Sequence, residues 1–363
     1  MTIQFKEQTK IGKILSRSKM IFYEFFEKWY FYSFKLAVYN SMWWIGNYCH
    51  PLVKLQFLAK HKMTTYMDNL LEMSVLPPPS PPRYTRALCQ PTTTSLTTLS
   101  SDCNPTNNTF TIHKSNLQRI VSSNDYKIWI FWWQGEESMP NLVRGCFQQV
   151  RNNNNNTILI TKENIRQYSD IPDYIFCRVD QGEISLTHLS DILRVSLLAK
   201  YGGIWLDSTC WISGSIPEVV KRMKLISPNT KNQPELPFWS DSRWCGWCSG
   251  TNVVQNPLFV FTRDVFYTFY KTRSCIPFYL FIDYVYDYAY RKIPEVKAMI
   301  DEMPENNISR NKLHFLLNNL WNEQEYDKLC KDNWVFKLSY KSVWDQKTIT
   351  GEDTYYGKLI SFE

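Results

Sequence analysis

The residues with the clearest chemical potential lie between Ser190 and Cys210, in the stretch SDILRVSLLAKYGGIWLDSTC. Asp191 and Arg194 are three positions apart, so they share one face if this segment is helical. Asp207 ends a short apolar run, and ligands of open α/β sheets bind beyond the carboxyl ends of the strands. A carboxylate there suits a hard divalent cation that bridges phosphate oxygens. The structural alternative is a helix salt bridge followed by an Asp that caps a turn.

The elements that must position these side chains alternate between helix and strand. Leu186–Tyr201 has an apolar face of helical period, and Gly202 and Gly203 end it before the strand Ile204–Asp207. Two strands and a helix are predicted upstream, at Lys127–Trp133, Thr157–Thr161 and Pro140–Val150. Such alternation predicts an α/β fold, with a Rossmann-type, mostly parallel sheet flanked by helices.

The N-terminal segment is basic and aromatic. Residues 1–66 hold ten Lys and Arg against three Glu, whereas the other 297 residues are neutral, so a nucleic-acid partner is not expected. The segment 21–48 contains 13 aromatic residues and is too polar and charged for a membrane span. The pattern fits a helix at an anionic lipid surface. The alternative is an aromatic helical hairpin packed on the main domain.

Composition divides the chain into three parts. Residues 77–109 contain seven Pro and twelve Ser or Thr, which favours a low-complexity linker over 77–120. We therefore expect a helical segment at 1–76 and the α/β domain at 121–363. The ten cysteines are irregularly spaced and no signal peptide is recognisable. These features predict a cytoplasmic protein, peripheral at the inner face of the cell membrane.

Four motifs carry a resemblance to a known family: FWWQG (131–135), SDILRVSLLAKYGGIWLDST (190–209), WCGWCSGTN (244–252) and TYYGKL (354–359). Together they resemble the nucleotide-sugar site of GT-A glycosyltransferases. More narrowly, residues 125–360 resemble the capsular polysaccharide synthesis protein family, which is similar to glycosyltransferase family 32 and to glucosylating toxins.

The resemblance implies a hexosyltransferase of retaining type that moves a sugar from a nucleotide-sugar donor to a capsular or other surface glycan, polymeric or lipid-linked. One alternative is a non-catalytic glycan-binding or scaffold protein of a polysaccharide-assembly complex. Another is a toxin-like effector that glycosylates host proteins, against which the lack of a recognisable export signal speaks.

The resemblance also implies roles for individual residues. Trp133, or Trp132 by one register, would stack the nucleobase; Asp191 would accept hydrogen bonds from sugar hydroxyls, and Arg194 would contact the sugar or a phosphate. Asp207 would hold Mn²⁺ or Mg²⁺ on the diphosphate. The remaining implied residues are Gly135, Tyr201, Gly203, Ser208 and Thr209 at the donor, and Trp247, Gly250 and Asp241 at the acceptor cleft.

This chain departs from the D-x-D motif of the family, because Asp207-Ser208-Thr209 has one carboxylate and two hydroxyls. Asp207 and Thr209 are the expected metal ligands, with weaker binding than two carboxylates would give. If the reaction inverts configuration, Asp241 and Asp283 are candidates for the acceptor-side base.

The C-x-x-C pair, Cys245 and Cys248, does not predict redox chemistry, because it follows the midpoint of the chain rather than an early strand. A zinc site would need two further ligands at suitable spacing, which the sequence lacks.

Overall fold

The central sheet has four strands in the order β2-β1-β3-β5. β1 (Ile128–Phe131) runs parallel to β2 (Thr157–Ile160) and to β3 (Gly203–Leu206), and β5 (Cys248–Thr251) is antiparallel to β3. The computed structural model describes residues 34–48, 53–74, 119–231 and 238–361, and several positions between 17 and 28. The predicted linker lies outside these residues except at its last two positions. The prediction of a mostly parallel sheet is confirmed.

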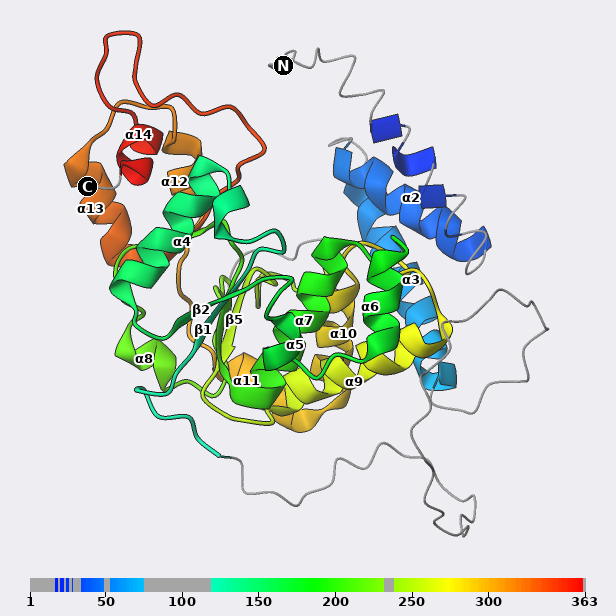
Figure 1. Cartoon of the computed structure of the whole chain (residues 1–363). Helices are drawn as coiled ribbons and strands as arrows, with labels where there is room; N and C mark the ends of the chain where they lie inside the picture. Colours follow the sequence, from blue (N-terminus) through cyan, green and yellow to red (C-terminus); the bar gives the residue numbers. More distant parts are fainter. Residues whose placement is uncertain are drawn as a thin grey trace.

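Helices cover both faces of this sheet (Figure 1). Trp129, Phe131 and Trp205 point to one face, where α7 (Leu186–Tyr201) packs with α9 (Pro257–Thr272) and α10 (Phe281–Lys292) behind it. The alternate residues of the same strands, such as Ile130 and Leu206, pack with α4 (Asn141–Asn153) on the other face. Strands buried on both sides are expected of a parallel sheet, and they explain the continuous apolar runs in the sequence.

A second, two-stranded sheet joins the C-terminal part of the chain to the end of β3. β4 (Cys210–Ile212) pairs antiparallel with β6 (Val335–Lys337), which brings Lys337 next to Cys210. The other elements of residues 136–361 are η2 (Glu136–Ser138), α5 (Ile165–Tyr168), α6 (Asp173–Asp180), α8 (Glu218–Lys221), α11 (Pro294–Glu302), α12 (Lys312–Leu316), α13 (Glu323–Asp332) and α14 (Tyr355–Ile360).

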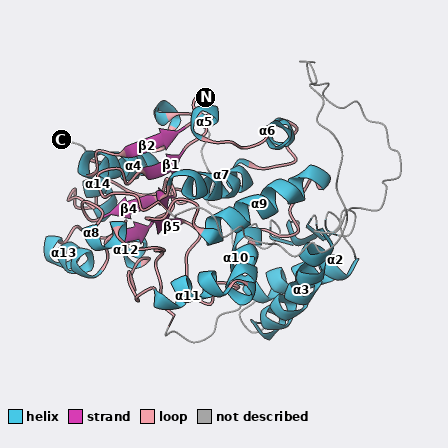
Figure 2. Cartoon of the chain, turned by 90° about the horizontal axis from the view of Figure 1, so that it is seen from below, coloured by secondary structure: helices cyan, strands magenta, loops and turns pink. Residues whose placement is uncertain are grey.

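The N-terminal helices α2 (Phe34–Tyr48) and α3 (Val53–Ser74) form a hairpin beside α10 (Figures 1 and 2). Trp43, Met63 and Met67 are buried in the same apolar core as α9 and α10. The described part of the segment therefore adopts the packed-hairpin alternative. Among the described helices, none combines the length and apolar character that crossing a bilayer requires.

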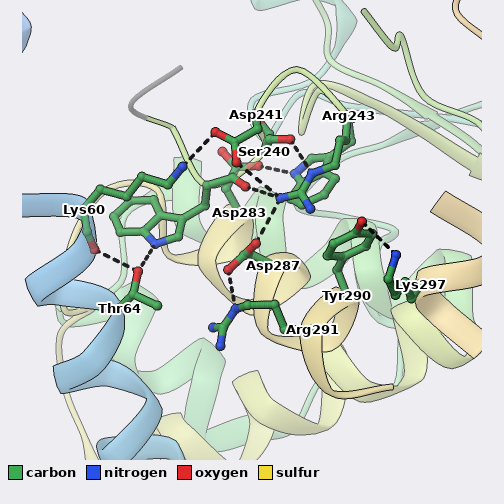
Figure 3. Close-up of polar contacts among 12 residues, drawn as sticks. Lys60, Thr64, Ser240, Asp241, Arg243, Asp283, Asp287, Tyr290, Arg291 and Lys297 are labelled. Carbon is green, nitrogen blue, oxygen red and sulfur yellow. Dashed lines mark hydrogen bonds and ion pairs between the residues drawn. The ribbon is translucent and has the colours of Figure 1, made fainter. Parts of the chain in front are cut away.

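Polar contacts also fix α3 to the domain, and we call the contact surface of α3 with α10 and residues 238–243 the hairpin seam (Figure 3). Lys60 Nζ lies 2.7 Å from Asp241 Oδ1, and Trp239 Nε1 donates to Thr64 Oγ1 at 2.9 Å. Further along α3, Asp68 accepts hydrogen bonds from both terminal nitrogens of Arg291 and from the Tyr284 hydroxyl. The seam contains hydrogen bonds and ion pairs as well as apolar contacts. Because these polar contacts are directional, they fix the orientation of the hairpin on the domain.

Candidate functional site

Arg194 joins the two carboxylates that the sequence singles out. Its Nη1 lies 3.1 Å from Asp191 Oδ1, one turn earlier on α7, and its Nη2 lies 3.1 Å from Asp207 Oδ1, just beyond β3. The guanidinium also stacks over the Trp205 ring, 5.2 Å from its centroid. The structure thus brings Asp191, Arg194 and Asp207 into one cluster at the carboxyl edge of the sheet.

The local sequence explains why helix and strand meet in this way. The Ser185 side chain caps α7 by accepting from the His188 backbone N–H, and Gly202 ends it with a φ of 68°. Gly203 has a φ of 88°, and a Cβ there would lie 2.2 Å from the Lys127 carbonyl oxygen. Only glycine therefore lets β3 start so close to β1. The pair of glycines sets β3 against α7, so that Asp207 faces Arg194.

Lys337 completes the cluster, and the sequence reasoning missed it. Its Nζ lies 2.7 Å from Asp207 Oδ2 and 2.9 Å from Thr209 Oγ1. Trp205 Nε1 donates to Asp207 Oδ1 at 3.0 Å. Both oxygens of Asp207 therefore accept from cationic side chains. The local signal is the run Val335-Phe336-Lys337-Leu338, in which a lysine interrupts an apolar strand.

Burial and charge act in opposite directions on the acids of the site. Burial alone would raise the pKa of Asp207, but Lys337 and Arg194 bring it below its usual value. Burial raises the pKa of Asp191 to about 7, against the opposing effect of Arg194. Burial likewise raises the pKa of Asp283 to about 6, although Trp244 Nε1 donates to its Oδ1 at 2.9 Å. Asp207 is thus the permanent anion of the site.

Access to solvent differs sharply within the cluster. The side chains of Asp207 and Lys337 are 30% and 27% exposed, whereas Arg194 is 4% exposed. Arg194 therefore lies behind Asp207 and orients it. An ammonium group has three N–H donors, of which Asp207 and Thr209 take two. The third donor of Lys337 can serve an incoming anion.

Several other expected residues lie at the same edge. Trp132 and Trp133 directly follow β1, and Ser208 follows Asp207. The Trp132 ring packs edge-on against Tyr340 and donates to Ser138 Oγ, while Trp133 packs against Phe131. Lys337 Nζ lies 5.8 Å from the Trp247 ring centroid, and the Trp247 carbonyl accepts from the Asp207 N–H. Gly135, with a φ of 86°, makes the turn after the two tryptophans.

The structure does not bring the remaining expected residues to this edge. Tyr201 and Gly203 lie at the start of β3, at the opposite end of the strand from Asp207. Gly250 lies inside the sheet, paired with Ile204, where a Cβ would be 2.8 Å from the Tyr126 hydroxyl. Asp241 is engaged by Lys60 in the hairpin seam. In this structure Gly203 and Gly250 lie where the chain packs closely, and Asp241 pairs with helix α3.

The two C-x-x-C cysteines also line the interior of this region. Cys248 starts β5 and is buried, and no helix begins at either cysteine. Burial raises the pKa of the Cys245 thiol to about 11, although Arg310 and Lys337 oppose the shift. Burial also raises the pKa of the Cys248 thiol, so neither thiol has the lowered pKa of a redox-active cysteine.

The side chains present do not fit the divalent cation that the resemblance implies. The expected ligands, Asp207 and Thr209, both contact the ammonium of Lys337. Within the described ranges, no group of three or more His, Cys, Asp and Glu side chains is placed to hold a metal. A metal at Asp207 would have to displace Lys337.

Comparison with known protein families identifies the family to which the chain belongs. A family model described as capsular polysaccharide synthesis protein matches residues 90–359. No curated protein and no solved structure matches the chain. The similarity to glycosyltransferase family 32 therefore stays a prediction. Since the matched residues include both sheets, α7 and the whole charged cluster, the chain belongs to the capsular polysaccharide synthesis protein family.

Proposed function

We propose that this protein is a GT-A-type glycosyltransferase that moves a sugar from a nucleotide-sugar donor to a capsular or related surface glycan. The observation that carries the proposal is Asp207, held by Arg194 and Lys337 at the carboxyl edge of β3 and still open to solvent. Membership of a capsule-synthesis family supports a sugar as the group transferred. Ligands of open α/β sheets bind at this edge.

In the proposed reaction, the bond between the anomeric carbon and the diphosphate oxygen breaks, and its electron pair leaves with the diphosphate. An acceptor hydroxyl oxygen forms the new bond to the anomeric carbon. In a retaining reaction its proton passes to the departing phosphate oxygen. In an inverting reaction it passes to a carboxylate, for which Asp283 is the candidate. The charge that grows on the leaving diphosphate is the main barrier, and fixed cations at the site lower it.

In our proposal, each side chain of the site has its own role in binding the donor. Asp191 and Asp207 accept hydrogen bonds from the hydroxyls of the sugar. Arg194, which is buried between them, orients both carboxylates. The nucleobase stacks on Trp132 or Trp133, and Trp132 is favoured because Tyr340 adds a second ring three residues after Lys337. Trp247 lines the sugar side of the site.

The test is a donor-hydrolysis assay with a panel of UDP-, GDP- and CMP-sugars, with the wild-type protein and with Asp207→Ala. We expect turnover of at least one donor and a loss of about 100-fold or more in the variant. Asp170→Ala is the matched control, because Asp170 also pairs with a lysine of the α7 region, Lys200, but at the far end of the helix. This control is expected to keep wild-type turnover.

Two results would contradict the proposal. One is no turnover of any donor together with no protection by any nucleotide in thermal melts. The other is glycan binding that is indifferent to Asp207→Ala, which is the result expected of the non-catalytic glycan-binding or scaffold alternative.

We also propose a lipid-linked or polymeric acceptor at the inner face of the cell membrane. The ring of Tyr279, which is half exposed, lies between Trp44 of α2 and His188 of α7, so the hairpin borders the site. Burial and the negative charges of Asp191 and Asp207 raise the pKa of Tyr279. Co-sedimentation with anionic vesicles tests membrane association; recovery of all protein in the supernatant would contradict it.

A further inference from the structure

Lys337 occupies the position where the resemblance implies a metal ion, between Asp207 and Thr209. Its ammonium bonds to Asp207 Oδ2 and Thr209 Oγ1, the two atoms expected to bind the metal. The ion pair between Lys337 Nζ and Asp207 Oδ2, at 2.7 Å, therefore already places a positive charge on the Asp207 carboxylate.

A further cation, besides Lys337 and Arg194, is Arg310. β6 is hydrogen-bonded to the preceding loop through the Lys337 N–H and the Arg310 carbonyl oxygen, at 2.9 Å. The Arg310 guanidinium and the Lys337 ammonium both act on the Cys245 thiol, lowering its pKa against the effect of burial. Arg310 Nη1 lies 3.4 Å from Thr230 Oγ1, and the Arg310 side chain also hydrogen-bonds to Cys245. Arg310 and Lys337 thus both reach Cys245, in the loop beside the Asp207 cluster.

We infer that Lys337 takes the place of the divalent cation, so that the donor diphosphate is held and its departure assisted without a bound metal. The inference rests on the proposed function. The third N–H of Lys337 donates to a phosphate oxygen, and Arg310 adds positive charge beside it. In the transfer step the electron pair of the broken carbon–oxygen bond goes to the diphosphate, whose new negative charge the ammonium stabilises. The lysine keeps its proton throughout, so no further reactant is needed.

The first experiment needs no variant. Binding of UDP, GDP, ADP and dTDP to the wild-type protein is measured by thermal shift and by calorimetric titration, in excess EDTA and in Mn²⁺ or Mg²⁺. The expected result is that at least one diphosphate binds and that its affinity in EDTA is within about twofold of that with metal. Titration of Mn²⁺ alone is expected to show no saturable binding.

The second experiment compares Lys337→Ala and Lys337→Arg. Lys337→Ala is expected to weaken binding of that diphosphate at least tenfold, and Lys337→Arg to weaken it less, because a cation is retained. Lys200→Ala is the matched control, since it breaks a lysine–aspartate pair at the opposite end of α7. Its diphosphate affinity is expected to equal that of the wild type.

The possible failures are distinguishable. Diphosphate binding or turnover that requires Mn²⁺ or Mg²⁺ would overturn the inference and leave the proposed transferase standing. Metal-independent binding that is unchanged in Lys337→Ala would also overturn it. If no diphosphate binds and no donor turns over under any condition, the proposed function itself fails.

Discussion

Two charged regions of this molecule use the same residue types in different ways. In the hairpin seam, Arg291 donates from all three of its nitrogens. Its Nε donates to Asp287 (Figure 3), and its two terminal nitrogens donate to Asp68. In the candidate site, Arg194 is buried more deeply, yet its Nε has no hydrogen-bond partner among the described residues. Among the described residues, the Lys337 ammonium likewise has acceptors for two of its three N–H donors.

This contrast separates the network that holds the fold from the network that can take a ligand. A saturated ion pair that joins two helices has nothing left to offer a ligand, so its removal should cost stability. An unsaturated cluster at the end of a parallel strand can exchange partners, so its removal should cost binding and turnover. Substitutions in each region test this division.

Asp207→Asn should reduce turnover more than any other change considered for the two regions. The substitution removes the charge that holds both Arg194 and Lys337, so donor hydrolysis should fall about 100-fold or more. The melting temperature should change by only a few degrees, because Asp207 is partly exposed. Steady-state kinetics and a thermal melt check both. Unchanged turnover would show that the cluster is structural, like the seam.

The corresponding change in the hairpin seam is Asp68→Ala, which should affect stability rather than turnover. It leaves Arg291 and the Tyr284 hydroxyl without their shared acceptor, which should lower the free energy of unfolding by roughly 2 kcal/mol. Urea denaturation measures the loss. Turnover per folded molecule should stay at the wild-type value. If the variant is fully folded but its turnover falls sharply, the seam also contributes to catalysis, and the two regions do not differ as proposed.

The candidate site should also make stability depend on pH. Asp191 has a pKa of about 7 in the folded protein, against about 3.9 in an unfolded chain. Between these two values the folded state binds more protons, so the free energy of unfolding falls as the pH rises, by at most about 1.4 kcal/mol for each pH unit. Asp191→Asn should flatten the dependence between about pH 4 and 7, as followed by urea denaturation. An equally steep curve in the variant would assign the effect to other groups.

Lys200→Ala should have the least effect of these substitutions. Its exposed pair with Asp170 belongs to neither network, and exposed pairs contribute little. Melting temperature and donor hydrolysis should both match the wild type. A clear change in either would mean that surface pairs of α7 contribute to the site.

The local part of this architecture could be predicted from the sequence, and the long-range part could not. The helical spacing of apolar residues and the glycine that follows them predicted the bounds of α7 correctly. β3 starts one residue earlier than predicted. The convergence of Asp191, Arg194 and Asp207 follows from one helix, one turn and one strand. Lys337 lies 130 residues beyond Asp207, on a strand of only three residues, and nothing in a single sequence links the two.

Because long-range contacts cannot be predicted from one sequence, some residues expected at the site lie away from the Asp207 edge. Gly203 and Gly250 are needed where backbones approach closely, and glycine serves packing and ligand contact equally well in a sequence motif. Asp241 pairs with Lys60, which lies across the segment expected to be a linker. Whether the aromatic hairpin faced lipid or protein depended on contacts between distant segments.

A crystal structure of the protein with the nucleoside diphosphate that binds most tightly, grown in EDTA, would test the role of the Asp207–Lys337 pair most directly. We expect a phosphate oxygen within hydrogen-bond distance of Lys337 Nζ and the base against Trp132 or Trp133. A diphosphate bound away from the Asp207 edge, with the Asp207–Lys337 pair closed and uninvolved, would contradict this role.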